Sequence, residues 1–108
     1  DAAFNAGRSA LLVAALTSDP DLLPAATQDR LHQQQRRAAY AQSLAVVAQL
    51  RSSGWAAVIS GAGPTVLVLA PTPAAAAEVA ANTFDGFATH VSEVGSGVRA
   101  TRIAETLT

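Results

Sequence analysis

The sequence contains no cysteine and no methionine, and only two of its residues are histidine. Without cysteine, disulfide bonds, thiolate metal sites and cysteine nucleophiles are excluded. His32 and His90 lie far apart along the chain and have no carboxylate-rich neighbourhood, so a zinc site is not expected. Because the chain begins at Asp1 and not at a methionine, we expect an internal or C-terminal piece of a longer protein.

Charged residues are also scarce, at 14% of the chain, and the formal net charge is −1. The sequence has no basic run of the kind that nucleic-acid binders carry. It also has no signal peptide and no apolar run near the ~20 residues that cross a membrane. We therefore expect a cytoplasmic protein that binds neither nucleic acid nor membranes. The hydrophobic share of 50% is high for a free-standing domain, which suggests that some surface covers another domain or subunit, a homodimer partner included.

No arrangement typical of a catalytic centre can be placed on the sequence. Ser60 stands at the end of one predicted strand and leads to another strand, whereas a nucleophile elbow needs a strand, a serine and then a helix. The glutamates at 78, 93 and 105 fall on separate elements, so no carboxylate pair suits acid–base chemistry. The phosphate-binding pattern G-x-x-x-x-G-K-[ST] is absent. The residues alone therefore predict anion-binding donors, but no catalytic group and no metal site in this chain.

Hydrophobic periodicity predicts helices over residues 2–16, 39–52 and 74–84, with a short helical turn within 19–27. Thr72 is expected to cap the last helix, with Pro73 as its first residue. Strands are expected over 55–60, 65–69, 87–94 and 98–103. This order predicts one α+β domain, a four-stranded antiparallel sheet with helices packed on one face. Residues 1–54 would form its mainly helical part, and residues 55–104 the sheet with one helix.

A glycine-rich stretch, Ser60-Gly61-Ala62-Gly63-Pro64, connects the first two predicted strands. Gly61 and Gly63 can take positive φ and let another group approach the backbone closely. The simple interpretation is a hairpin with a glycine-rich turn. The alternative is a loop whose free amides face an anion or a polar ligand.

Three arginines, Arg30, Arg36 and Arg37, lie in a polar segment ahead of the helix expected over 39–52. The usual place for such residues is a solvated surface. Alternatively, one of them turns inward to bind a carboxylate or a phosphate, a task for which the planar guanidinium is well suited.

Three stretches of the sequence, residues 1–12, 29–36 and 60–66, resemble motifs of one enzyme family. Residues 60–66 resemble the third conserved motif of the GHMP kinases, and residues 1–12 resemble the start of the first helix of the homoserine kinase C-terminal region. Residues 29–36 resemble the D-x-L-H-Q-P-Y-R segment of homoserine kinases. The three occur in the family's order over most of the 108 residues, so residues 1–108 are identified as a GHMP kinase C-terminal domain with a ferredoxin-like fold. The alanine- and arginine-rich composition is typical of a high-GC actinobacterium.

The resemblance implies a parent enzyme that transfers the γ-phosphoryl group of ATP to the hydroxyl of L-homoserine, with Mg²⁺, on the way to threonine. ATP and Mg²⁺ would be bound mainly by an N-terminal ATP-binding domain that this chain lacks, and that domain and L-homoserine would be its partners. Phosphoryl transfer depends on positioning and on charge stabilisation. We therefore expect the isolated 108-residue chain to be inactive.

The resemblance also implies roles for individual residues. Arg36 matches the family arginine that holds the substrate carboxylate, a natural bidentate pair. Gly61 matches a glycine whose backbone borders the amino-acid site. Gln34-Gln35 replace the family's Pro-Tyr pair before that arginine, which makes Arg37 an alternative to Arg36. Three further residues match family positions without an assigned contact, and packing or capping would explain them: Asn5, Arg8 and His32.

Other functions stay open at this point. Another GHMP kinase, of the isoprenoid-pathway type, would share the glycine motif but not the segment around His32. A stand-alone amino-acid-binding α+β module would bind its ligand at Gly61–Gly63 without ATP. In a structural dimerisation domain, the glycines would serve only as turn residues.

Overall fold

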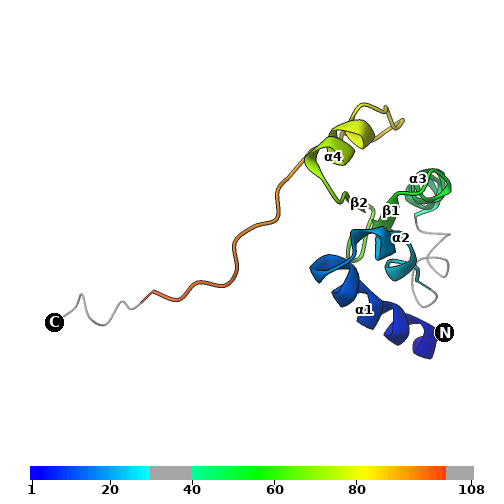
Figure 1. Ribbon diagram of the computed structural model, residues 1–108. Coiled ribbons are helices and arrows are strands. Elements are labelled where there is room, and N and C mark those ends of the chain that lie inside the picture. The colour runs from blue at the N-terminus through cyan, green and yellow to red at the C-terminus, as the bar shows by residue number, and fades with distance from the viewer. Residues whose placement is uncertain (30–39, 102–108) are drawn as a thin grey trace.

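The computed structural model describes residues 1–29 and 40–101 of the chain (Figure 1). Residues 1–29 hold helix α1, a 3-10 turn η1 and a short helix α2. Residues 40–87 hold helix α3, strands β1 and β2, and helix α4. The bounds are α1 Ala2–Thr17, η1 Pro20–Leu22, α2 Leu23–Ala26, α3 Ala41–Ser52, β1 Ala56–Ile59, β2 Val66–Leu69 and α4 Pro73–Ala80. Each predicted helix and the first two predicted strands are therefore present.

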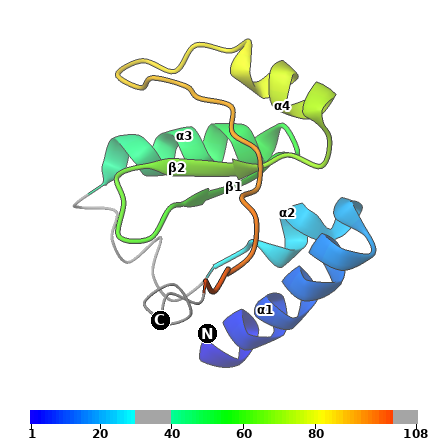
Figure 2. The same ribbon diagram turned by 90° about the vertical axis from the view of Figure 1, so that its left-hand side faces the viewer.

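Strands β1 and β2 form an antiparallel hairpin in which Ala56 pairs with Leu69 and Ile59 pairs with Val66. Successive side chains of a strand point to opposite faces of the sheet. Accordingly, Ala56 packs in an apolar cluster with residues of α1 and α2, and Ala57 packs in a second cluster with residues of α3 and α4. Helices thus cover both faces of the hairpin (Figure 2). The prediction of helices on one face was wrong, because both sides of β1 are apolar and both are buried.

The sheet has two strands in the described part of the chain, and not the predicted four. Residues 88–101 form no helix or strand, and residues 102–103 lie outside the described residues. An alternating apolar pattern cannot form a strand without a neighbour to take up its backbone hydrogen bonds. Here the segment runs away from the hairpin (Figure 1), and Val94 and Val98 are fully exposed. The α+β class with an antiparallel sheet is confirmed, whereas the strand number was wrong.

The size of the molecule reflects this extended segment. The radius of gyration is 17.0 Å, whereas a compact chain of this length has roughly 13 Å. The packed part of the structure, which we call the body, consists of residues 1–29 and 40–87.

Local chemistry sets the ends of α3 and α4. The Thr72 hydroxyl oxygen accepts a hydrogen bond of 3.1 Å from the Ala75 N–H, which confirms the predicted N-cap. Gly54 follows α3 with φ 90°. Its N–H donates to the Arg51 carbonyl at 2.9 Å, and the Trp55 N–H donates to the Leu50 carbonyl at 3.1 Å. These two bonds form a Schellman motif, as expected from a glycine at this position.

Helix α4 ends at Ala80, four residues before the predicted end at Phe84. The Asn82 side-chain amide donates to the carbonyls of Glu78 at 3.2 Å and Val79 at 3.3 Å. An asparagine that satisfies the last carbonyls in this way competes with further helical turns. Phe84 lies beyond the helix but is nevertheless buried in the α3 and α4 cluster.

Candidate functional site

The glycine loop, Ser60–Pro64, joins β1 to β2 and is closed by two backbone hydrogen bonds. The Ser60 N–H donates to the Thr65 carbonyl at 2.7 Å, and the Gly63 N–H donates to the Ser60 carbonyl at 3.0 Å. Gly61 has φ 58°, Gly63 has φ 80°, and the Gly63–Pro64 peptide bond is cis. Both glycines therefore adopt the positive φ that their residue type permits.

The two glycines of the loop differ in their surroundings. A Cβ atom on Gly61 would meet no atom within 4 Å, and Gly61 and Ala62 are exposed. A Cβ on Gly63 would lie 3.0 Å from Ile59 Cγ2 and 3.4 Å from two ring carbons of Tyr40. The tip of the loop, Gly61-Ala62, is therefore exposed, whereas Gly63 is packed against the body.

The beginning of α3 holds the glycine loop. The Ser43 hydroxyl donates to the Pro64 carbonyl at 2.6 Å, and Ser43 is only 2% exposed. Tyr40 directly precedes α3, and its ring lies against Gly63. Tyr40 is one of the apolar residues whose periodicity predicts this helix, but the pattern does not indicate that Tyr40 contacts the loop. The spacing of Tyr40 and Ser43 is the one available signal, because residues three apart share a helix face.

Asn5 and Arg8 both lie on α1, and each has a contact within the body. The Asn5 side-chain amide donates to Asp29 Oδ1 at 2.6 Å. The Arg8 guanidinium carbon lies 4.5 Å from the centroid of the Phe4 ring, a cation–π distance. Asn5 therefore joins α1 to Asp29, the last residue of the first described range.

His32, Arg36 and Arg37 lie outside the described residues. Their segment spans residues 30–39, and the residues on either side of it are described. Asp29, before it, is bonded to Asn5. Tyr40, after it, is packed against Gly63. The residue that follows this segment, Tyr40, is therefore in contact with the glycine loop.

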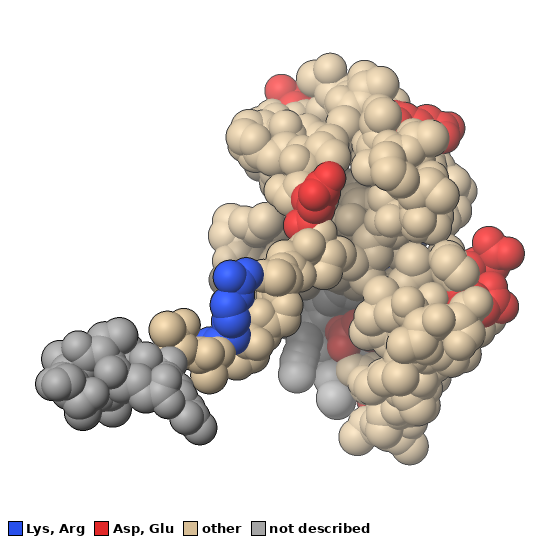
Figure 3. Space-filling model, turned by 60° about the vertical axis from the view of Figure 1, so that its left-hand side comes forward, with Lys and Arg blue, Asp and Glu red and all other residues tan. Residues whose placement is uncertain are grey.

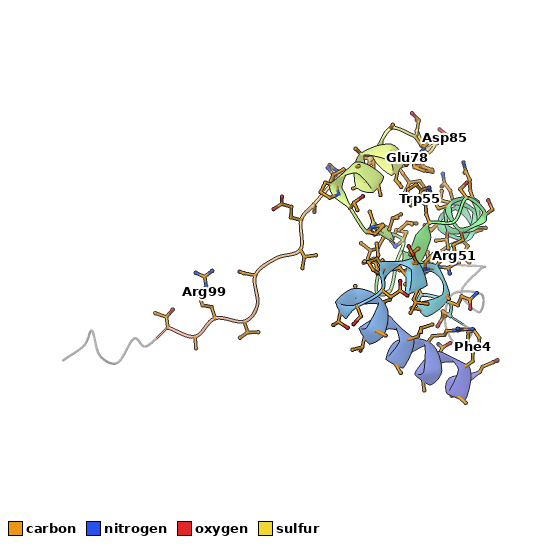
Figure 4. The ribbon with its side chains drawn as sticks, viewed as in Figure 1. Phe4, Arg51, Trp55, Glu78, Asp85 and Arg99 are labelled. Atoms are coloured by element: carbon orange, nitrogen blue, oxygen red, sulfur yellow. The ribbon has the colours of Figure 1, made fainter. Side chains whose placement is uncertain are left out.

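Arg51, near the other end of α3, reaches three oxygens on neighbouring elements. Its Nη1 donates to Thr27 Oγ1 at 2.9 Å and to the Ala57 carbonyl at 3.0 Å, and its Nη2 donates to the Pro24 carbonyl. Burial lowers the pKa of the Arg51 guanidinium from its ordinary value, because desolvation disfavours the charged form. Figure 4 shows Arg51 between α2, α3 and β1. The sequence predicts an arginine that complements its own helix end; the guanidinium instead joins α2 and β1.

The described residues contain no group of three His, Cys, Asp or Glu side chains that could hold a metal ion. On the face shown in Figure 3, acidic side chains lie in separate places and do not gather into one patch. Within the same two described ranges, no helix has the length and the apolar character needed to span a membrane.

Comparison with known proteins places the glycine loop inside a known domain family. Residues 10–84 match the family described as GHMP kinases C terminal, and the chain belongs to this family. Among curated relatives, the homoserine kinase of Mycobacterium sp. strain KMS is 52% identical over 100 residues, covering 92% of this chain and 32% of the relative. The homoserine kinase of Streptomyces avermitilis is 64% identical over 70 residues, covering 65% of this chain and 23% of the relative.

The homoserine kinase of Leifsonia xyli is 55% identical over 73 residues, covering 68% of this chain and 23% of the relative. The chain thus spans between 23% and 32% of the length of these three relatives. All three organisms are actinobacteria, in agreement with the composition of the sequence.

Proposed function

We propose that this chain is the C-terminal, substrate-facing domain of a homoserine kinase. The parent enzyme would transfer the γ-phosphoryl group of ATP to the side-chain hydroxyl of L-homoserine, giving ADP and O-phospho-L-homoserine. One observation carries the proposal: 52% identity over 92% of the chain to a relative named homoserine kinase. The glycine loop lies within the matched domain, residues 10–84.

In this proposal, the tip of the glycine loop borders the amino-acid site. The backbone at Gly61 is exposed, and a Cβ there would have no neighbour within 4 Å. Within residues 1–29 and 40–101, no backbone carbonyl accepts a hydrogen bond from the Gly61 N–H. An exposed amide at a positive-φ glycine is suited to donate to a polar group of a ligand. Gly61 would thus contribute a backbone donor and space, without a side chain.

Arg36 would hold the substrate carboxylate through a bidentate, charge-assisted pair. Arg36 precedes Tyr40 by four residues in the sequence. Tyr40 in turn packs against Gly63. The chain path therefore supports a site in which an arginine and the glycine loop meet the same small amino acid. Arg37 is the alternative donor, and no substrate contact is proposed for His32.

ATP and Mg²⁺ would be bound mainly by a preceding N-terminal domain. The relatives are three to four times longer than the matched segment, which covers 23–32% of them. The described residues do not offer a set of metal ligands, so no step at a metal is assigned to this chain. Its contribution would be to bind L-homoserine and to orient the hydroxyl toward the phosphoryl group, the positioning on which such reactions depend.

The proposal is tested with the full-length protein that contains this chain. We expect ADP release that requires L-homoserine, with O-phospho-L-homoserine identified by ³¹P NMR. Mevalonate and other GHMP-kinase substrates serve as controls for the related isoprenoid kinases. Turnover of mevalonate but not of L-homoserine would overturn the proposal in favour of that alternative.

An experiment on the isolated 108-residue chain separates the kinase domain from the stand-alone amino-acid-binding module. We expect no kinase activity from it, with the full-length protein at equal molarity as the control and circular dichroism to establish folding. Tight calorimetric binding of L-homoserine by the folded isolated chain, combined with an inactive full-length protein, would favour the binding module.

A further inference from the structure

We propose that Tyr40 and Ser43 are positioning residues for the glycine loop: from the beginning of α3 they fix the loop so that its tip meets the amino-acid substrate. Neither residue would touch the substrate itself. The inference rests on the proposed function, because it assigns an effect on L-homoserine binding to two side chains of the body.

The hydrogen bond of Ser43 is unusual among the helical hydroxyls of this chain. Thr17 donates to the Val13 carbonyl and Ser52 donates to the Gln49 carbonyl, both within their own helices. Ser43 instead donates out of α3 to the Pro64 carbonyl at 2.6 Å. It is 2% exposed, so water cannot readily replace this donor. A buried hydroxyl that bonds across 21 residues of sequence fixes the position of the loop relative to the helix.

Tyr40 restrains the loop at the neighbouring residue. A Cβ atom placed on Gly63 would lie 3.4 Å from two ring carbons of Tyr40 and 3.0 Å from Ile59 Cγ2. The ring and the Ile59 methyl group therefore pack against Gly63 and prevent the loop from moving inward. The contact is apolar in character, so it depends on the ring and not on the tyrosine hydroxyl.

Together the two contacts hold Gly63 and Pro64 and leave Gly61-Ala62 exposed. The loop is thus fixed on its β2 side and exposed at its tip.

The first test is kinetic and uses the full-length protein. Ser43→Ala and Tyr40→Ala are expected to raise KM for L-homoserine roughly three- to tenfold, the loss of one hydrogen bond or its equivalent. KM for ATP should stay unchanged. Ser43→Thr restores the hydroxyl and Tyr40→Phe keeps the ring, so both should recover most of the affinity. Ser52→Ala is the matched control, because it removes a similar bond of 2.7 Å at the far end of the same helix.

The second test does not depend on the substrate. Hydrogen–deuterium exchange of the full-length protein should be faster in the peptide covering residues 60–65 of Ser43→Ala, and unchanged there in Ser52→Ala. Unchanged exchange in this peptide of Ser43→Ala would overturn the proposal. Equal rises in KM for L-homoserine and for ATP, together with a loss of thermal stability, would also overturn it. Faster loop exchange in a protein that never phosphorylates L-homoserine would support the loop contact while refuting the proposed kinase function.

Discussion

The two ends of α3 use the same kind of contact for different purposes. At the N-terminal end, Ser43 donates to the carbonyl of Pro64. At the C-terminal end, Arg51 donates to the carbonyls of Pro24 and Ala57. Each side chain satisfies backbone acceptors outside its own helix. The difference lies in the acceptors: Pro64 belongs to a loop with an exposed tip, whereas Pro24 and Ala57 belong to packed elements of the body.

This comparison shows that a polar contact cannot be assigned to stability or to function from its geometry alone. The Arg51 end connects α2, α3 and β1, and it is reinforced by the Schellman motif at Gly54. We therefore expect changes there to lower the free energy of unfolding. The Tyr40 and Ser43 end restrains a loop whose tip is exposed, so changes there should mainly affect ligand binding.

The largest effect is expected at the segment that enters the N-terminal end of α3. Arg36→Ala should raise KM for L-homoserine roughly 10- to 100-fold, because a charged hydrogen-bond pair is lost. Arg37→Ala, the neighbouring residue, is the matched control and should change KM little. The measurement is steady-state kinetics of the full-length enzyme. The opposite ranking of the two variants would assign the carboxylate contact to Arg37.

At the C-terminal end, Arg51→Met should lower the free energy of unfolding by about 2–3 kcal/mol, since partly buried carbonyls lose a charged donor. Arg51→Lys keeps the charge but not the fork-shaped donor, and should recover only part of the loss. Urea unfolding of the full-length protein measures both. KM for L-homoserine in the folded fraction should stay unchanged, and a rise as large as that of Ser43→Ala would remove the distinction between the two ends.

The glycine pair sharpens the comparison within the loop. Gly63→Ala should cost about 2–3 kcal/mol, because φ is 80° and the added Cβ would lie 3.0 Å from Ile59 Cγ2. Gly61→Ala has open space around the Cβ and should cost only about 1 kcal/mol, from its positive φ.

The order of the two glycine variants by KM for L-homoserine should differ from their order by loss of stability. Gly61→Ala places a methyl group at the exposed tip and should raise KM for L-homoserine despite its small cost in stability. Equal KM values for Gly61→Ala and the wild type would show that the tip does not border the substrate.

The smallest effect is expected at Gln42, which also belongs to the first turn of α3. Its side-chain amide donates to the Asp85 carbonyl at 2.9 Å in an exposed position. Gln42→Ala should cost about 0.5 kcal/mol, since water can replace this donor, and it should leave KM for L-homoserine unchanged. A KM change like that of Ser43→Ala would mean that the whole first turn, and not the contact with the loop, determines substrate affinity.

Much of the secondary structure could be predicted because its signals are local. Thr72-Pro73 and Gly54 specify helix ends through the chemistry of one turn. The apolar positions of α1, α3 and the β1–β2 hairpin follow from periodicity. The positive φ of Gly61 and Gly63 follows from their residue type. The roles of Arg36 and Gly61 were implied by family resemblance and stay predictions.

The rest depended on contacts between residues far apart in sequence. The segment 87–101 has a strand-like pattern, yet a strand exists only where a neighbouring backbone accepts its hydrogen bonds. No pattern indicated that Ala56 and Ala57 would be buried under different helices. Ser43 and Arg51 looked like ordinary helical residues, because the partners that give them their roles lie at Pro64 and Ala57.

The sequence by itself thus determined the helices, the hairpin and the conformational freedom of the glycine loop, because these depend on propensities within a few residues. Only the tertiary structure decided which helix holds that loop, which part of it is exposed and which arginine joins the layers. These depend on directional hydrogen bonds and close packing, and both require the chain to be brought together first.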